Sequence, residues 1–308
     1  MKLGFIFPGQ GSQYVGMGKA LYGTSPEART IFDRADSLLG FLLTRTLFDG
    51  PEDELTRTDV CQPAIFVHSM AVLAGIQKEG RLCADVTAGL SLGEYAALCL
   101  AGVFSFEEGL GLVQARGRLM QEASERCPGG LVSLLGISVE AAQTLCARTG
   151  AVIANLNSPD QVVVAGDPPS LEQLVQLAPG SGVRRAIRLQ VAGAFHSPLM
   201  DDAALGLEKE LDRVTFRTPR IPVYSNLTGG LERDPVRIKS CLKDQVNHAT
   251  RWVDCCQEML KAGVRHFVEI GPGSVLRGLM RKIDPSATVI SVEDPSQLKD
   301  SPLLKGVV

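Results

Sequence analysis

Hydrophobic positions in this chain form short apolar runs that alternate with longer amphipathic segments. The first run, residues 2–7, is of β type and ends in a glycine-containing loop. Buried strands followed by glycine loops and helices are typical of parallel sheets. The pattern predicts an α/β protein with helices that include 20–39, 62–77 and 106–123, and a polar, loose tail from Pro295.

The pattern changes between residues 128 and 192. Strand, helix, strand, strand, helix and strand are expected in turn, at 131–135, 139–148, 151–156, 162–165, 170–177 and 184–191. This βαββαβ order is typical of a ferredoxin-like unit. We therefore expect a small ferredoxin-like domain, residues 128–192, inserted into a larger α/β domain made of residues 1–127 and 193–308.

Composition and charge argue against several classes of function. The net charge of −3 gives no general attraction for nucleic acid or for an anionic membrane. No apolar run reaches the length of a membrane span, and the first glycine loop comes too early for a signal peptide. The eight cysteines show no C-x-x-C spacing, which disfavours a zinc site or a disulfide scaffold and predicts a cytoplasmic protein.

The segment AGLSLGEY, residues 88–95, carries the clearest chemistry. Gly89, Ser91 and Gly93 fit G-x-S-x-G, the motif that places a nucleophilic serine on a strained turn between a strand and a helix. The apolar run 83–88 and the expected helix 94–100 supply that context. The alternative is a glycine-framed helix start without chemistry.

A serine nucleophile needs a general base, and the chain has four histidines. His68 lies in an expected helix and His266 in an expected strand, whereas His196 and His248 lie in loops. The pattern alone leaves these two open, and it offers no aspartate as a third member. The loop after the first strand, PGQGSQ, is either a plain turn or a set of backbone N–H groups that binds an oxyanion.

Several motifs together carry a resemblance to a known family. The chain resembles the malonyl-CoA:acyl carrier protein transacylases, and also the acyltransferase domains of polyketide synthases, from its first strand to about residue 293. The motifs are FPGQGSQ (7–13), GLSLGEYAAL (89–98), LVQARG (112–117), NLNSPDQVVVAG (155–166), AFHSPLM (194–200) and EIGPGSVL (269–276). The resemblance implies an α/β-hydrolase-like large domain with the inserted small domain.

The resemblance also implies a role for each matched residue. Ser91 would be the acylated nucleophile and His196 its base. A backbone carbonyl, here that of Gln245, orients the histidine in this family and replaces the missing acid. Backbone N–H groups of Gln10 and Leu92 would form the oxyanion hole.

Three further positions bear on the choice of acyl group. Arg116 matches the arginine that pairs with the free carboxylate of the malonyl group. Phe195 before the histidine resembles the malonyl-selective pattern, as opposed to the methylmalonyl-selective one. Leu90 departs from the family, which usually has histidine there, and this puts the polarity of the site and the lifetime of the acyl-enzyme in doubt.

The implied reaction is a ping-pong transfer of malonyl from coenzyme A to the phosphopantetheine thiol of an acyl carrier protein, without a metal or redox cofactor. The alternatives are an acyl hydrolase that clears carrier proteins, a general serine esterase and an inactive scaffold. Acidic carrier proteins would dock on basic residues near the cleft. The candidates are Arg184, Arg185, Arg188, Arg277, Arg281 and Lys282.

Overall fold

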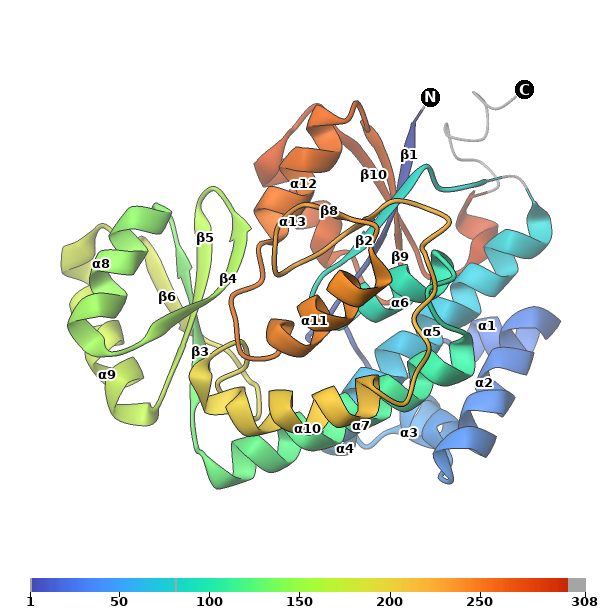
Figure 1. Cartoon of the computed structure of the whole chain (residues 1–308), viewed down its shortest axis with the longest axis horizontal. Coiled ribbons are helices and arrows are strands. Elements are labelled where there is room, and N and C mark those ends of the chain that lie inside the picture. The colour runs from blue at the N-terminus through green and yellow to red at the C-terminus, as the bar shows by residue number, and fades with distance from the viewer. Residues whose placement is uncertain (1, 81, 299–308) are drawn as a thin grey trace.

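Two β-sheets organise the molecule (Figure 1). The computed structural model describes residues 2–80 and 82–298. The larger sheet has six strands in the order β10 (Thr288–Val292), β9 (His266–Ile270), β1 (Leu3–Phe7), β2 (Val86–Gly89), β7 (Val223–Tyr224) and β8 (Leu231–Glu232). Neighbouring strands are parallel from β10 to β7, and β8 pairs antiparallel at the edge. The expected mixed α/β architecture is confirmed.

The central strand β1 determines where the functional loops meet. All of its residues are buried, and it pairs with β2 on one side and β9 on the other. Phe7 lies opposite Gly89, the last residue of β2. Because parallel strands end at the same edge of a sheet, the glycine loop after β1 and the serine turn after β2 are neighbours there.

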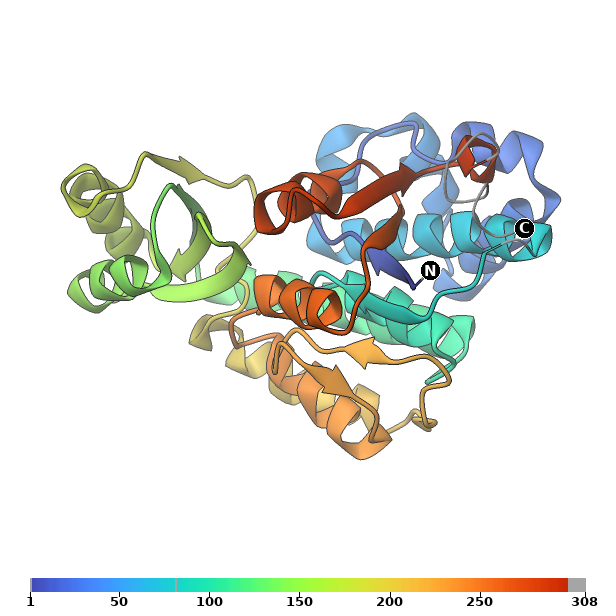
Figure 2. The same cartoon turned by 90° about the horizontal axis from the view of Figure 1, so that it is seen from above.

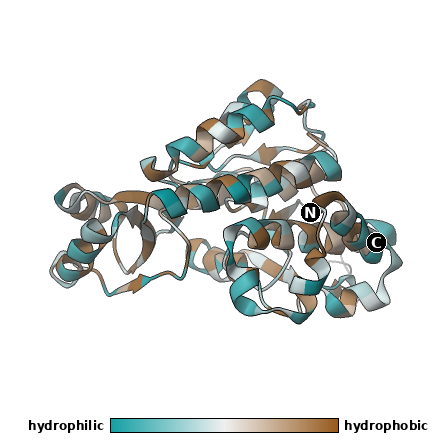
Figure 3. Ribbon diagram, turned by 90° about the horizontal axis from the view of Figure 1, so that it is seen from below, coloured by the Kyte–Doolittle hydropathy of each residue, from teal (hydrophilic) through white to brown (hydrophobic). Residues whose placement is uncertain are grey.

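Helices pack on both faces of this sheet. Side chains alternate between the faces along β1, so that Phe5 and Phe7 join one hydrophobic cluster and Ile6 joins another. The surface helices carry hydrophobic and hydrophilic residues along their length, as amphipathic helices do (Figure 3). The helices are α1 (Lys19–Thr24), α2 (Pro26–Leu39), α3 (Leu43–Asp49), α4 (Glu52–Thr56), α5 (Thr58–Glu79), α6 (Gly93–Leu100), α7 (Phe106–Arg126), α10 (Asp201–Leu211), α11 (Pro235–Gln245), α12 (Trp252–Lys261) and α13 (Val275–Ile283).

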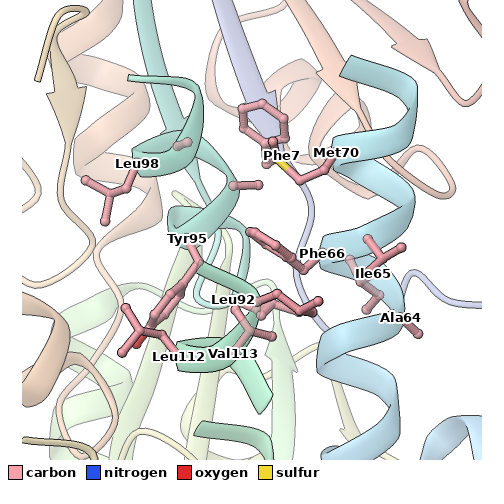
Figure 4. Close-up of a cluster of buried hydrophobic side chains, with 14 of the residues drawn as sticks. Phe7, Ala64, Ile65, Phe66, Met70, Leu92, Tyr95, Leu98, Leu112 and Val113 are labelled. Carbon is pink, nitrogen blue, oxygen red and sulfur yellow. The ribbon is translucent and has the colours of Figure 1, made fainter. Parts of the chain in front are cut away.

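The helix α5 lies in the core. It is the one helix within residues 2–80 and 82–298 that is long and apolar enough to cross a membrane, but 89% of its most apolar stretch is buried inside the molecule. Met70 of this helix lies beside Phe7 of β1, and Phe66 points toward α6 (Figure 4). Packing inside the protein therefore accounts for the hydrophobicity of α5.

The smaller sheet is antiparallel and lies to one side of the larger unit (Figure 2). Its four strands have the order β4 (Val152–Ser158), β5 (Gln161–Gly166), β3 (Gly130–Leu135) and β6 (Arg185–Arg188). The helices α8 (Val139–Thr149) and α9 (Pro168–Leu177) pack against it and share a separate hydrophobic cluster. The small sheet thus has its own core.

A backbone bridge ties the small sheet to the large unit. The N–H of Leu156 in β4 donates to the carbonyl of Thr250, and the N–H of Thr250 donates to the carbonyl of Ala154, each at 2.9 Å. Thr250 lies in the segment between α11 and α12. The two units are therefore joined by hydrogen bonds as well as by the chain itself.

Two local expectations were wrong, and one helix was missed. The helix expected over residues 20–39 is interrupted at Ser25, whose hydroxyl caps α2 by accepting from the N–H of Ala28, with Pro26 at the first helical position. The helix α11 was not expected from the sequence, although Ile238, Cys241, Leu242 and Gln245 are buried at the spacing of an amphipathic helix. The tail expected to be loose begins with a short 3₁₀-helix, Pro295–Leu298, that buries both of its ends, and residues 299–308 lie outside the described residues.

Candidate active site

Ser91 lies on a sharp turn between β2 and α6. Its φ is 52°, in the left-handed region that residues other than glycine seldom adopt. Glycines on both sides permit the turn: a Cβ on Gly89 would lie 1.9 Å from the carbonyl carbon of Gly93, and a Cβ on Gly93 would lie 2.2 Å from the carbonyl oxygen of Phe7. The turn therefore has the geometry of a nucleophile elbow.

His196 is the histidine that meets this serine. Its Nε2 lies 2.9 Å from Ser91 Oγ, and its Nδ1 lies 2.7 Å from the carbonyl oxygen of Gln245. Gln245 ends α11, and carbonyls in the last turn of a helix lack an intrahelical donor. His248, the other candidate, is exposed and its Nδ1 faces Asp244 and Asn247.

The contact with Gln245 decides which nitrogen of His196 carries the proton. A carbonyl can only accept, so Nδ1 donates and Nε2 is left to accept the proton of Ser91 Oγ. Burial and then the positive charge of Arg116 lower the pKa of His196 to about 4. The imidazole is therefore neutral near pH 7, which is the form that a general base requires.

Arg116 projects from α7 into the same site. Its side chain is 1% exposed, and its Nη2 donates to Ser91 Oγ at 3.0 Å and to Gln245 Oε1 at 3.1 Å. Its Nη1 donates to Gln62 Oε1 at 2.7 Å. Within the described residues Arg116 has no salt bridge to a carboxylate, whereas the exposed Arg118 pairs with Glu122. A buried guanidinium whose partners are neutral oxygens can accept an anionic ligand.

These groups line a cleft between the two units. Ser91, Arg116 and His196 face it from the larger unit, together with residues of the glycine loop. The wall from the smaller unit is formed by Leu131, Asn155, Asn157, Gln161, Val163, Leu189 and Val191. The lining is mostly apolar with a few polar groups, which is typical of a small-molecule site.

The two backbone donors expected for an oxyanion hole are free. Gln10 lines the cleft, and Leu92 follows the serine at the start of α6, with its side chain buried in the core (Figure 4). Neither N–H donates a hydrogen bond within the described chain, whereas the N–H of Ser91 donates to Asn226 Oδ1 at 2.6 Å. Free N–H groups beside a serine nucleophile are what an oxyanion needs.

The acyl transferase domain family has a sequence model that matches residues 4–294. The chain belongs to this family. Its relatives include the malonyl CoA-acyl carrier protein transacylase of Bacillus subtilis, which is 39% identical over 303 residues, or 97% of this chain and 95% of that protein.

Solved structures of the acyl transferase family agree. The malonyl CoA-acyl carrier protein transacylase of Clostridium perfringens is 37% identical with a TM-score of 0.92, over 97% of this chain and 95% of that one. A malonyl-transacylase in complex with its type II polyketide synthase acyl-carrier protein is 34% identical with a TM-score of 0.93, over 97% of this chain and 98% of that one.

This acyltransferase has three buried polar residues at the site that the sequence pattern does not single out. Gln62 contacts Arg116. Asn226 contacts the serine turn, and Glu94 contacts Gln245. Glu94 lies within the AGLSLGEY segment, and Asn226 lies two residues after the end of β7, the strand beside β2. A polar residue at the carboxyl end of a neighbouring parallel strand was the only available indication for Asn226.

Proposed function

We propose that this acyltransferase moves a malonyl group from coenzyme A to the phosphopantetheine thiol of an acyl carrier protein. The observation that carries the proposal is the placement of buried Arg116, with Nη2 3.0 Å from the nucleophilic oxygen of Ser91. The malonyl group ends in a carboxylate, and Arg116 is a cation that lies beside the reacting atom. Relatives named as malonyl transacylases over almost the full chain support the same substrate.

In the first half-reaction, Ser91 Oγ attacks the thioester carbon of malonyl-CoA while His196 Nε2 takes the hydroxyl proton. The N–H groups of Gln10 and Leu92 stabilise the oxyanion of the tetrahedral intermediate. The carbon–sulfur bond then breaks, and His196 returns the proton to the coenzyme A sulfur. The malonyl group is left as an ester on Ser91.

The second half-reaction runs the same steps with a new nucleophile. The phosphopantetheine thiol gives its proton to His196 Nε2 and attacks the ester carbon. The bond to Ser91 Oγ breaks, and His196 returns the proton to that oxygen. The carrier protein leaves with the malonyl thioester, and the enzyme regains the hydrogen bond between Ser91 and His196.

Acyl choice depends on the groups that surround the malonyl chain. We propose that the carboxylate displaces neutral acceptors of Arg116 and forms two parallel hydrogen bonds with the guanidinium. Phe195 is buried and lines the cleft, which supports malonyl over a branched methylmalonyl group. Leu90 also lines the cleft and packs on the hydrophobic cluster around Trp252, so the position is apolar where the family usually has histidine.

We also propose the finer description of the fold. The strand order β4-β5-β3-β6, with two helices and antiparallel pairing throughout, supports a ferredoxin-like insert at residues 128–192. The parallel sheet and elbow support an α/β-hydrolase-like unit formed by 1–127 and 193–308. The free cysteines among the described residues agree with a cytoplasmic location, which stays a prediction.

Intact-mass measurement tests the function. Incubation with malonyl-CoA is expected to give one malonyl adduct, which disappears when a holo acyl carrier protein is added and reappears as malonyl carrier protein. If the adduct decays instead to free malonate at the same rate with and without carrier protein, the enzyme is an acyl hydrolase. If malonyl-CoA gives no adduct while simple esters are cleaved, it is an esterase.

A further inference from the structure

Glu94 is a buried carboxylate that the proposed reaction steps do not use. It lies in the first turn of α6, three positions after the nucleophile, and is 1% exposed. Within the described residues it forms no salt bridge. Its Oε2 accepts from Gln245 Nε2 at 2.6 Å and from the N–H of Asn226 at 3.0 Å. Burying a carboxyl is unfavourable unless hydrogen bonds compensate for the lost water, and both of its donors belong to the site.

The first of these hydrogen bonds leads to the base. The side-chain amide of Gln245 is held between Glu94, which accepts from Nε2, and Arg116, which donates to Oε1 at 3.1 Å. Since an arginine can only donate, this pair fixes which way the amide points. The backbone carbonyl of the same residue accepts from His196 Nδ1 at 2.7 Å. Glu94 thereby anchors the residue that orients the base.

The second hydrogen bond leads to the elbow. Glu94 accepts from the N–H of Asn226, and the side chain of Asn226 spans the serine turn. Its Oδ1 accepts from the N–H of Ser91 at 2.6 Å, and its Nδ2 donates to the carbonyl of Gly89 at 2.7 Å. These contacts hold both sides of a turn whose central residue has a strained, positive φ.

We propose that Glu94 is a positioning residue for acyl transfer. It holds Gln245, whose carbonyl orients His196, and Asn226, whose side chain spans the Ser91 turn, in one fixed arrangement. The proposal rests on the proposed function, because it concerns the rate of that reaction. Glu94 acts through Gln245 and Asn226, and it contacts neither substrate nor the reacting atoms.

This role requires an acceptor oxygen at the position of Glu94 Oε2, and it does not require a negative charge. Burial raises the pKa of Glu94 to about 7, while its hydrogen bonds to Asn226, Gln245 and Ser225 and the nearby charge of Arg116 oppose that rise. Both donors use the same oxygen, Oε2, which can accept in the carboxylate and in the carboxylic acid. A glutamine at this position also presents one acceptor oxygen, so it should preserve the arrangement.

Glu269 provides a matched control. It is fully buried too, and its oxygens accept from the N–H groups of Leu276 and Arg277 and from the hydroxyl of Ser291. These contacts tie the start of α13 to the sheet and do not lead to Ser91 or His196. Glu269→Gln therefore removes a buried carboxylate that does not contact Ser91, His196 or Gln245. Because both of its oxygens accept hydrogen bonds, the variant loses one accepting oxygen, and its folding is checked beside its rate.

The test compares Glu94→Leu, Glu94→Gln and Glu269→Gln by rapid-quench acylation with malonyl-CoA, per folded molecule. Glu94→Leu should lower the maximal acylation rate roughly 10–100-fold, the range known for removing the hydrogen-bond partner that orients a metal-binding side chain, which serves as the guide. The malonyl-CoA concentration at half-maximal rate should stay nearly constant. Glu94→Gln and Glu269→Gln should acylate at close to the original rate.

A proton NMR measurement reports on the orientation of His196. The downfield proton resonance of His196 Nδ1–H, assigned by its absence in His196→Ala, should shift or broaden in Glu94→Leu and stay in place in Glu269→Gln. If Glu94→Leu does not fold, Gln245→Met replaces it, because that variant keeps the backbone carbonyl and loses the amide that Glu94 holds. The same loss of rate is expected.

Each other outcome overturns the inference. An unchanged rate in Glu94→Leu, or in its substitute, means that Glu94 does not position the site. Equal losses in Glu94→Gln and Glu94→Leu mean that charge matters and that the acceptor oxygen does not suffice. An equal loss in Glu269→Gln means that any buried carboxyl has this effect. If the unmodified enzyme forms no malonyl adduct, the proposed function fails instead, and the two failures are thereby distinguished.

Discussion

The larger unit and the smaller unit contribute opposite kinds of wall to the cleft. On the larger side, hydrogen bonds join Ser91, His196, Arg116 and Gln245 into one buried network. On the smaller side, Asn157 Oδ1 is buried without a hydrogen-bond partner. Reacting groups must be fixed before the reaction begins, whereas a recognition surface can keep polar atoms free for a ligand. The difference places the proposed reacting groups on the wall of the larger unit, together with Arg116, whose Nε is likewise buried without a hydrogen-bond partner among the described residues. The wall of the smaller unit carries none of the groups of the proposed reaction steps.

Removing the proposed nucleophile should abolish acylation completely. Ser91→Ala deletes the only oxygen to which the acyl group is bound in the proposed reaction, so no malonyl adduct should be seen by intact mass. Thermal unfolding should stay near that of the unmodified protein, because the lost hydroxyl is half-buried. An adduct in the variant would place the nucleophile elsewhere.

Removing the base should leave a slow enzyme. His196→Ala is expected to lower the acylation rate roughly 10²–10⁴-fold, the usual contribution of a positioned general base. His248→Ala changes an exposed histidine whose nitrogen faces Asp244 and Asn247, and it should have little effect. The reverse order of effects would contradict the assignment of the base.

The pH dependence sharpens this prediction. Because burial and Arg116 lower the pKa of His196 to about 4, the imidazole stays neutral as the pH falls from 7. A base with an ordinary histidine pKa, about 6.5, would lose activity near that value. The acylation rate should therefore hold well below pH 6 and fall only as the pH approaches 4. Stopped-flow measurements at several pH values check this, and a midpoint near 6.5 would contradict it.

Removing the guanidinium of Arg116 should lower the rate of malonyl transfer without lowering that of acetyl transfer. Arg116→Ala is expected to lower malonyl transfer by roughly two to three orders of magnitude, in line with about 2–5 kcal/mol for a broken buried pair. Acetyl transfer, which brings no carboxylate, should stay level or rise. Arg118→Ala is the matched control, since that arginine is exposed and pairs with Glu122. Equal losses with malonyl-CoA and acetyl-CoA would make Arg116 a structural residue.

The two walls also differ in how far the sequence predicts them. The elbow could be predicted because its strand, turn and helix are adjacent in the chain. The choice between His196 and His248 could not be made from pattern, because the contact with Ser91 joins residues 105 positions apart and depends on the end of α11. That helix buries Ile238, Cys241, Leu242 and Gln245 at helical spacing, but such a local pattern does not show where the carbonyl of Gln245 lies relative to a histidine 49 positions earlier.

Buried polar contacts were the least predictable part of the site. Glu94 reads as an ordinary first-turn acidic residue of α6, and its partner Asn226 is 132 positions away. Nothing local distinguishes it from an exposed glutamate at a helix start. The family resemblance named the expected reacting residues and the carbonyl of Gln245, and it did not name Glu94, Asn226 or Gln62.

The smaller unit should matter to the carrier protein more than to the chemistry. Asp160 lies 3.9 Å from Arg184 Nη2 in the small unit and 3.7 Å from Lys282 Nζ of α13. It thereby brings the two predicted basic groups to one rim of the cleft. Arg188, next to the cleft-lining Leu189, is exposed and forms no salt bridge among the described residues. Acidic side chains of a carrier protein could pair with this rim.

Reversing one rim charge gives the smallest expected effect and the sharpest test of the comparison. Arg188→Glu should raise the KM for carrier protein by roughly fivefold or less, since an exposed pair contributes about 0.2–1 kcal/mol. The effect should shrink in high salt, because exposed charges are screened. Acylation by malonyl-CoA should be unchanged, since coenzyme A needs no carrier contact.

Arg148→Glu makes the same change in charge on α8, outside the residues that line the cleft. If it raises the KM equally, net charge and not a docking rim attracts the carrier. If Arg188→Glu slows both half-reactions together, the small unit takes part in the chemistry and the division between the walls is wrong.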